Sequence, residues 1–323
     1  MNKRQDWGAV LAALWLLLAP VSVAAQQGVE ILVEGIAHDA LFSIDFDDSA
    51  RHAVAVGAVA TVIESSDGGR TWTRTAAAPA GDHALLGIDL RGERRIAVGQ
   101  SGLVVIKDGA DGDWRKVDSG TDQRLLSVSA NNKGLAFAVG AFGTVIRSTD
   151  GGQSWTPVQI DWTQWMTQAV VEPHMYDARV GEDGQVLLVG EFGTVIRSTD
   201  GGESWAQTHR ADASLFSIDV GDQGVGMAVG QEGAAIKTTD WGQTWTPVDH
   251  GLGANLLGVY FGGDGLVVLA GMREMAISKD GGKRWRRLLD PEILTNWYSA
   301  VGPSADGGFV AVGQAGKIVH IPG

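Results

Sequence analysis

Short apolar runs recur along the chain, separated by turns rich in glycine. One run reads LFSIDF at 41–46, LLGIDL at 85–90, LLSVSA at 125–130 and LFSIDV at 215–220. Each leads into a second run of the type AVAVG, a glycine-flanked turn, a third run of the type TVIRS and a fourth of the type WTPV. Runs of this length that are rich in Val and Ile, and bounded by turn residues, predict β-strands. The pattern therefore predicts units of four strands.

An eight-residue box separates the third and fourth runs. It reads STDGGQSW at 148–155 and STDGGESW at 198–205, and related boxes end at Trp72, Trp114, Trp245 and Trp285. Successive box tryptophans lie 42, 41, 50, 40 and 40 residues apart. A glycine closes the second run of every unit, and it occurs seven times: Gly57, Gly99, Gly140, Gly190, Gly230, Gly271 and Gly313. The chain thus contains seven repeats.

Four strands in about 40 residues cannot bury both faces of their own sheet, so the repeats must stack on one another. Seven repeats predict an all-β fold, a seven-bladed β-propeller with four-stranded antiparallel blades, over residues 26–323. The seventh repeat reaches Gly323 without a box or a fourth run. We expect the segment VEILVEG at 29–35 to supply the missing strand and to close the last blade.

The boxes are expected to be structural turn clamps. Their Ser or Thr and Asp side chains can accept hydrogen bonds from the turn backbone, the glycines permit positive φ, and the Trp can return to the interface between blades. Contact with a sugar is the alternative role. The residues concerned are Asp67, Trp72, Trp114, Asp150, Trp155, Asp200, Trp205, Asp240, Trp245, Asp280 and Trp285.

Residues 1–25 differ in composition from the rest of the chain. Lys3 and Arg4 precede an apolar run at 8–19, and small residues follow up to Ala25. This order is typical of a secretory signal peptide, and the run is shorter than the roughly 20 residues that span a bilayer. We expect a periplasmic or secreted protein that is not inserted in the membrane after signal cleavage.

Charge and cysteine content exclude several classes of function. The chain has 25 Lys and Arg against 38 Asp and Glu, a net charge of −13, which disfavours binding to nucleic acid. It has no cysteine, which excludes disulfides, thiolate catalysis and cysteine-ligated metals. No cofactor is expected.

The sequence GxxGTVIRSTDGGxSW, present at 140–155 and 190–205, resembles the bacterial neuraminidase or Asp-box repeat. More specifically, it resembles the photosystem II stability and assembly factor family, in a branch found in bacteria without photosynthesis. The likeness covers 29–323. It implies an exported, non-catalytic scaffold that binds a membrane-protein complex or an exporter component, and we expect a monomer with a membrane-associated protein partner.

The same resemblance implies a basic patch built from the third runs of successive blades. The matching positions are Arg147, Arg197 and Lys237, but Glu64 and His320 occupy the position in the first and seventh repeats. The alternative is that these three cations are simply solvated.

An enzyme is not expected. Sialidase chemistry needs a Tyr nucleophile, and Tyr176, Tyr260 and Tyr298 stand in no recognisable catalytic motif. Paired carboxylates could be assembled by the fold, as in Asp-box glycoside hydrolases. A secreted carbohydrate-binding or glycoside-hydrolysing propeller is therefore the alternative function.

Five histidines precede inner strands and would share one face of the propeller: His38, His83, His174, His209 and His250. Imidazoles gathered in this way could ligate a metal, but histidine is also common in exposed loops. We expect no metal.

One insertion breaks the regular spacing of the repeats. Twenty residues connect Trp155 to the run that begins at Met175, whereas 10 to 13 suffice elsewhere, so the insertion is about QIDWTQWMTQAVVEPH at 159–174. It should lie on the same face as the turns GAFG and GEFG. We expect a partner-binding cluster of Phe142, Phe192, Trp162, Trp165 and Met166, rimmed by Asp161, Glu172 and Glu191. The alternative is that the insertion merely packs over the two Phe rings.

Overall fold

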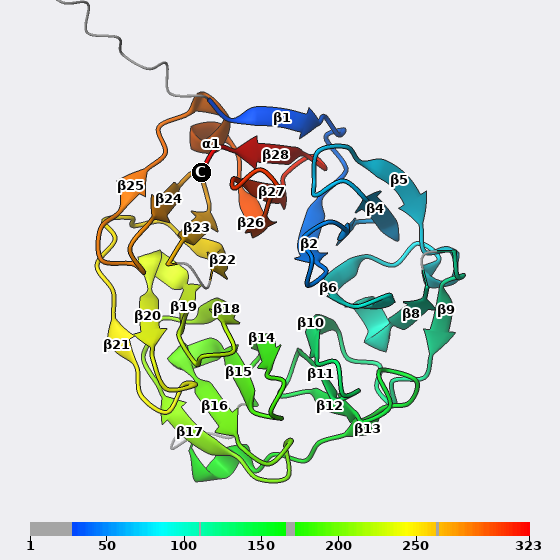
Figure 1. The fold of residues 1–323 in the computed structure, drawn as a ribbon. Helices are drawn as coiled ribbons and strands as arrows, with labels where there is room; N and C mark the ends of the chain where they lie inside the picture. The colour runs from blue at the N-terminus through cyan, green and yellow to red at the C-terminus, as the bar shows by residue number, and fades with distance from the viewer. Residues whose placement is uncertain (1–27, 110, 166–171, 263–264) are drawn as a thin grey trace, which may run out of the picture.

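Seven four-stranded antiparallel sheets surround a central channel in the computed structural model (Figure 1). The structure describes residues 28–109, 111–165, 172–262 and 265–323. The expected signal peptide at 1–25 and Met166 lie outside the described residues. The architecture confirms the predicted seven-bladed propeller.

Each of the first three blades follows the order of the chain from the channel outwards. Blade 1 consists of β2 (Leu41–Phe46), β3 (Ala53–Gly57), β4 (Thr61–Ser65) and β5 (Thr73–Ala76). Blade 2 consists of β6 (Leu85–Arg91), β7 (Arg94–Gly99), β8 (Val104–Asp108) and β9 (Arg115–Val117). Blade 3 consists of β10 (Leu125–Ala130), β11 (Ala136–Gly140), β12 (Val145–Ser148) and β13 (Thr156–Pro157).

The next three blades repeat this order. Blade 4 consists of β14 (Met175–Val180), β15 (Val186–Gly190), β16 (Val195–Ser198) and β17 (Ala206–His209). Blade 5 consists of β18 (Leu215–Val220), β19 (Gly226–Gly230), β20 (Ala235–Thr238) and β21 (Thr246–Pro247). Blade 6 consists of β22 (Leu256–Phe261), β23 (Val267–Gly271), β24 (Met275–Ser278) and β25 (Arg286–Arg287).

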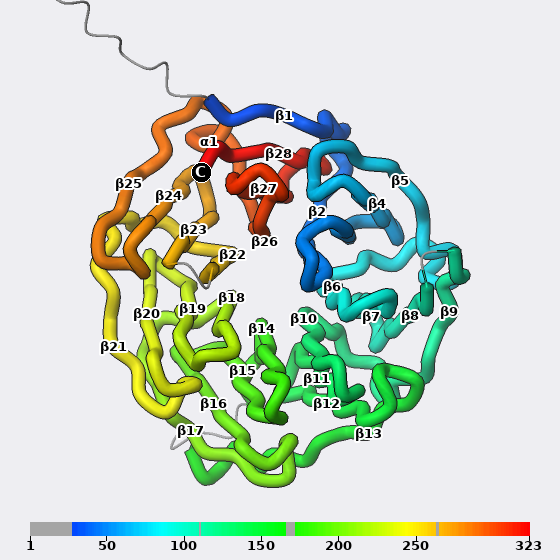
Figure 2. The backbone as a smooth tube through the Cα atoms, viewed as in Figure 1, coloured from blue at the N-terminus to red at the C-terminus, as the bar shows by residue number. Residues whose placement is uncertain are grey.

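Blade 7 joins the two ends of the chain. It consists of β26 (Tyr298–Pro303), β27 (Phe309–Gly313), β28 (Ile318–Ile321) and, outermost, β1 (Glu30–Val33). Strand β1 pairs antiparallel with β28, with Glu30 opposite His320, so the blue and red ends of the trace lie side by side (Figure 2). The predicted closure by the N-terminal strand is consistent with this pairing.

Helical structure among the described residues is confined to the connections. One α-helix, α1 (Pro291–Thr295), and five 3-10 turns lie there between strands: η1 (Ala78–Ala80), η2 (Gln100–Gly102), η3 (Trp162–Gln164), η4 (Glu191–Gly193) and η5 (Gln231–Gly233). No helix in the described ranges is both long and apolar enough to span a bilayer.

Apolar side chains bury the faces between neighbouring blades. The described residues form seven buried clusters, one at each interface between blades. In the interface of blades 2 and 3, Trp155 from the third box packs with Ile96 and Val128. Every box tryptophan lies in the interface with the preceding blade in this way. The stacking that the sequence predicted is therefore what holds the repeats together.

The box turns have the expected clamp geometry. In the third box, Asp150 Oδ1 accepts from Ser154 N at 3.0 Å, Ser148 Oγ accepts from Gly152 N at 2.8 Å, and Trp155 Nε1 donates to Gly152 O at 3.1 Å. Gly151 and Gly152 both have positive φ. In the fifth box Trp241 replaces the first glycine and still adopts φ 55°, with its side chain buried.

The two faces of the ring carry different connections because strands alternate in direction within each blade. One face holds the turns between first and second strands and the boxes between third and fourth strands; we call it the clamp face. The other holds the turns between second and third strands and the connections from one blade to the next; we call it the turn face. The two faces therefore present different sets of side chains.

Candidate functional site

Each turn between a second and a third strand has a strained residue at its tip. The tip residue has φ between 51° and 62° in all seven blades: Val59, Ser101, Phe142, Phe192, Glu232, Arg273 and Ala315. This left-handed conformation is uncommon for non-glycine residues, and a bulky side chain there is an outlier. Thr144 N donates to Ala141 O at 3.1 Å and Thr194 N to Glu191 O at 3.1 Å, which closes each turn around its Phe.

Exposed apolar side chains gather on the turn face. Eight large apolar side chains are exposed among the described residues. One of them, Ile31, lies on the outer strand β1 and not on the turn face. The other seven lie in connections of the turn face: Ile36, Val59, Phe142, Phe192, Met272, Leu289 and Leu294. Apolar surface collected on one face is typical of an interaction site.

Phe142 and Phe192 occupy the tips of the neighbouring blades 3 and 4. Phe142 is 61% exposed and Phe192 is 39% exposed. The Phe142 ring meets His174 edge to face at 4.9 Å, and Phe142 N donates to His174 Nδ1 at 2.9 Å. The Glu191 carboxylate in turn accepts from His174 N at 2.8 Å. The backbone around the two rings is thus fixed while the rings themselves face solvent.

The insertion divides into a buried and a peripheral part. Trp162 is only 5% exposed and belongs to the core between blades 3 and 4, and Trp165 meets it edge to face at 6.0 Å. A Cβ on Gly143 would lie 2.5 Å from Trp162 Nε1, so the glycine after the Phe142 tip leaves room for this indole. Packing therefore accounts for Trp162, whereas Phe142 and Phe192 remain uncovered by it.

The three cations carried over from the family resemblance form ties between blades. Arg147 Nη1 lies 2.6 Å from Glu203 Oε1, in the box of the next blade. Likewise Arg197 Nε donates to Trp241 O at 2.8 Å and Lys237 Nζ donates to Gly281 O at 2.7 Å. All three side chains are partly buried, so they are neither a free patch nor fully solvated. The sequence did indicate this contact, because the third strand and the box keep the same spacing in successive repeats. The three cations by themselves do not reveal it.

Three further histidines of the turn face bond to nearby backbone. His83, His209 and His250 each place a ring nitrogen within 3.1 Å of a carbonyl oxygen, of Ala80, Gly193 and Gly233 respectively. Within the described parts of the chain, no group of three or more His, Asp or Glu side chains could hold a metal ion.

The first strands line a central channel of about 740 Å³. Near the turn face their second residues are Phe42, Leu86, Leu126, Tyr176, Phe216, Leu257 and Ser299. Near the clamp face their fifth residues are Asp45, Asp89, Ser129, Arg179, Asp219, Tyr260 and Gly302. One end of the channel is therefore mainly apolar and the other is polar. Runs such as LFSIDF already carry this division in their second and fifth residues.

Comparison with known proteins agrees with this architecture. Residues 22–121 match the model of the photosynthesis system II assembly factor YCF48 family, and residues 146–157 match the BNR/Asp-box repeat. Over these residues the chain is similar to the photosystem II assembly factor family and carries an Asp-box repeat. This confirms the resemblance inferred from the repeated motif. No curated protein matches the chain.

Solved structures share the fold of this propeller. YCF48 from Cyanidioschyzon merolae is 19% identical with a TM-score of 0.73, over 92% of this chain and 99% of that one. A structure described as YCF48 bound to D1 peptide is 18% identical with a TM-score of 0.72, over 92% of this chain and 97% of that one. The GH74 xyloglucanase from Xanthomonas campestris is 14% identical with a TM-score of 0.71, over 90% of this chain and 53% of that one. Because an enzyme shares the fold, the fold does not decide between binding and catalysis.

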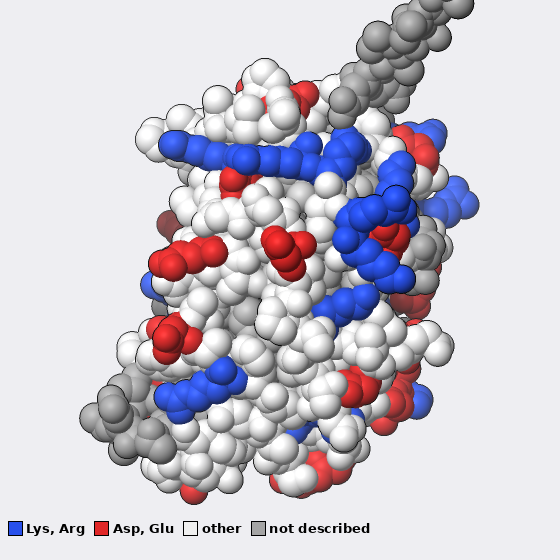
Figure 3. Space-filling view, turned by 90° about the vertical axis from the view of Figure 1, so that its left-hand side faces the viewer, with Lys and Arg blue, Asp and Glu red and all other residues white. Residues whose placement is uncertain are grey.

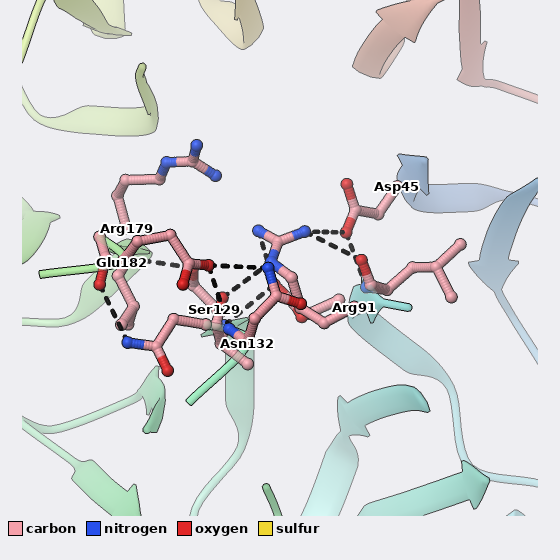
Figure 4. Close-up of polar contacts among 12 residues, drawn as sticks. Asp45, Arg91, Ser129, Asn132, Arg179 and Glu182 are labelled. Carbon is pink, nitrogen blue, oxygen red and sulfur yellow. Dashed lines mark hydrogen bonds and ion pairs between the residues drawn. The ribbon is translucent and has the colours of Figure 1, made fainter. Parts of the chain in front are cut away.

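At the polar end of the channel of this propeller, Arg91 of blade 2 contacts both neighbouring blades (Figure 4). Its Nη1 lies 3.5 Å from Asp45 Oδ2 of blade 1, its Nη2 lies 3.3 Å from Asp89 Oδ2, and its Nε donates to Ala130 O of blade 3 at 2.9 Å. Removal from bulk water raises the pKa of Asp45 to about 7, although the Arg91 charge opposes the shift. The same cause raises the pKa values of Asp89, Asp177 and Asp219.

Proposed function

We propose that the propeller is a non-catalytic, exported scaffold that binds a component of a membrane-protein complex through its turn face. The observation that carries the proposal is the gathering on that face of seven of the eight large apolar side chains that are exposed among the described residues. A surface of this kind is costly to leave in water and usually marks a contact with another molecule.

Phe142 and Phe192 are the expected anchors of the contact. A glycine would fit their left-handed backbone without strain, yet each turn holds a large aromatic ring there. Buried aromatic side chains supply much of the binding energy in protein interfaces. Glu172 and Glu191 are nearby acidic residues, so the partner segment should be apolar and free of acidic side chains at this point.

A peptide ligand is supported by the similar YCF48 structure, which is described as bound to D1 peptide. Export is supported by the composition of residues 1–25, which precede the described chain. The absence of recognisable catalytic motifs in the sequence supports a binding role over hydrolysis.

The test is capture of native membrane proteins by the tagged chain in detergent extracts of the source organism, followed by mass spectrometry. Phe142→Ala combined with Phe192→Ala should abolish capture, whereas Ile31→Ala, which removes exposed apolar surface from outside the turn face, should leave it unchanged. Equal capture by both variants would refute the turn face as the docking site. Binding to a glycan array that depends on the same two rings would favour the carbohydrate-binding alternative instead.

A further inference from the structure

Blade 6 carries a cluster of cations on an otherwise acidic protein. Between residues 273 and 287 there are six cations and two acids, a local net charge of +4, whereas the whole chain has −13. The cations are Arg273, Lys279, Lys283, Arg284, Arg286 and Arg287, and all six are exposed. Figure 3 shows Lys and Arg side chains gathered on the side of the propeller that carries β25.

Most of these cations lack an acidic partner. Arg284 pairs with Asp280 at 2.7 Å and Arg287 pairs with Glu274 at 2.6 Å. The other four have no carboxylate within 4.0 Å in the described part of the chain. The positive charge of the cluster is therefore available to an external anion.

The fold does not require these cations, because other repeats form the same box turn with neutral residues at these positions. Where the sixth box has Lys283 and Arg284, the third box has Gln153 and Ser154. The Ser154 hydroxyl donates to Asp150 Oδ2 at 2.6 Å, and Arg284 Nε makes the equivalent bond to Asp280 Oδ2 at 2.7 Å. The clamp is thus preserved while two charges are added.

The outer strand shows the same substitution. Strand β25 is Arg286–Arg287, whereas the corresponding strands of blades 3 and 5 are Thr156–Pro157 and Thr246–Pro247. Both arginines are exposed at the outer edge of the blade. Stability of the blade therefore does not explain this pair of charges.

Apolar side chains adjoin the cluster at the turn-face end of blade 6. Met272 is 46% exposed, and Leu289 and Leu294 in the connection to blade 7 are 71% and 38% exposed. Arg273 follows Met272, and Arg287 is separated from Leu289 by one residue. Lys279, Lys283 and Arg284 lie farther along the same outer edge, in the box of the clamp face. An edge that combines basic and apolar side chains is typical of proteins that lie on an anionic membrane, where the cations meet headgroups and the apolar side chains enter the interface.

The N-terminal end of the described chain lies at the same edge. Val29 N donates to Asp290 Oδ2 at 3.0 Å, next in sequence to Leu289. The described chain therefore begins beside this surface.

We propose that the basic and apolar edge of blade 6, defined by Met272, Arg273, Lys279, Lys283, Arg284, Arg286, Arg287, Leu289 and Leu294, docks the protein peripherally on an anionic lipid bilayer. This contact is separate from the Phe142 and Phe192 surface, and it holds the scaffold at the membrane while that surface is free to bind a partner.

The test is co-sedimentation of chain 26–323 with vesicles of phosphatidylcholine, with or without phosphatidylglycerol. We expect binding only to the anionic vesicles and a loss of binding as salt rises. The combined variant Lys283→Gln, Arg284→Ser and Arg286→Thr takes its residues from blade 3, so it should fold. At about fivefold per lost charge, it should bind the anionic vesicles at least tenfold more weakly. Leu289→Ser should weaken binding by a few-fold.

The matched control removes the same number of exposed cations elsewhere, as Arg51→Gln, Arg70→Gln and Lys116→Gln. It should bind like the unmodified chain, because these residues lie in blades 1 and 2. If the control bound the anionic vesicles as weakly as the blade 6 variant, the effect would come from net charge alone and the proposal would be overturned. Equal binding to vesicles with and without phosphatidylglycerol would do the same, as would displacement by inorganic phosphate beyond that by chloride at equal ionic strength. Capture of a partner through the Phe surface is measured separately, so either proposal can fail without the other.

Discussion

Asp45 of blade 1 accepts a hydrogen bond of 2.7 Å from the backbone N–H of Leu90 in blade 2. The contact recurs around the channel: Asp89 accepts from Ala130 N, Ser129 from Val180 N and Asp219 from Phe261 N. In blades 1, 2, 3 and 5 the fifth residue of the first strand thus joins its blade to the next one. Blade 4 has Arg179 at this position, and its Nε donates to Val220 O of blade 5 at 2.8 Å. Blades 6 and 7 have Tyr260 and Gly302 there.

Stability should decrease with pH through the titration of Asp45. Its pKa is raised to about 7 in the folded chain, above the value of about 3.9 in an unfolded one, so the folded state favours the neutral acid. The contribution is fully present below about pH 4 and is lost as pH rises through 7. Asp45→Asn keeps an acceptor for Leu90 N without the charge, and should raise the melting temperature more at pH 8 than at pH 5. Asp212→Asn, at an exposed position outside the channel, is the control; an Asp45→Asn difference independent of pH would contradict the assignment.

The boxes should respond to acid in the opposite sense. Burial opposes the shift, but hydrogen bonds from Ser154 and Ser148 prevail and lower the pKa of Asp150 to about 2. The stability that this carboxylate contributes is present above about pH 4 and is lost as pH falls through 2. Asp150→Asn should lower the free energy of unfolding by about 1 kcal/mol at pH 7, and the difference should shrink towards pH 2. Urea titrations at several pH values measure both quantities.

Substitutions of Phe142 and Trp162 should affect the free energy of unfolding differently, because the Phe142 ring is exposed and the Trp162 ring is packed in the core. Phe142→Gly relieves a left-handed φ of 53° but loosens the unfolded chain, so the free energy of unfolding should change by less than about 1 kcal/mol. Trp162→Ala leaves a cavity in the core between blades 3 and 4 and should cost about 3 kcal/mol. Denaturant unfolding gives both values. A large loss for Phe142→Gly would mean that its ring supports the fold and is not held in place for a partner.

Removal of the N-terminal strand should weaken closure of the ring. Deletion of 29–34 leaves β28 as an unpaired edge and uncovers apolar side chains of the core between blades 7 and 1, to which Leu32 and Val33 contribute. The melting temperature should fall clearly, and the freed edge should promote aggregation. An unchanged melt would show that β1 adds nothing to closure. Deletion of 1–25, which precedes the described chain, is the control and should leave the melting temperature as it is.

The repeats, their four strands and the clamp turns could be predicted from the sequence because they depend on local chemistry. Alternating apolar residues specify strands, and the spacing of Ser, Asp and Gly in STDGGQSW specifies a turn that closes on itself, as Ser148, Asp150 and Gly152 do. Seven copies of such a unit leave few ways to bury their faces other than a ring. The missing fourth strand of the last copy similarly indicated how the ring closes.

The tertiary structure decided what each side chain meets across a blade interface. Trp162 and Trp165 lie three residues apart in one insertion, but the gap above Gly143 admits only the Trp162 indole fully. Arg147, Arg197 and Lys237 have polar partners because the next blade brings its box within reach, 44 to 56 residues further along the chain. The cations of blade 6 can be read from the sequence KDGGKRWRR. Their exposure near Leu289 and Leu294 follows from the outer position of β25, which the sequence alone does not show. Local sequence determines turns and strands, whereas burial and pairing depend on neighbours that only the closed ring brings together.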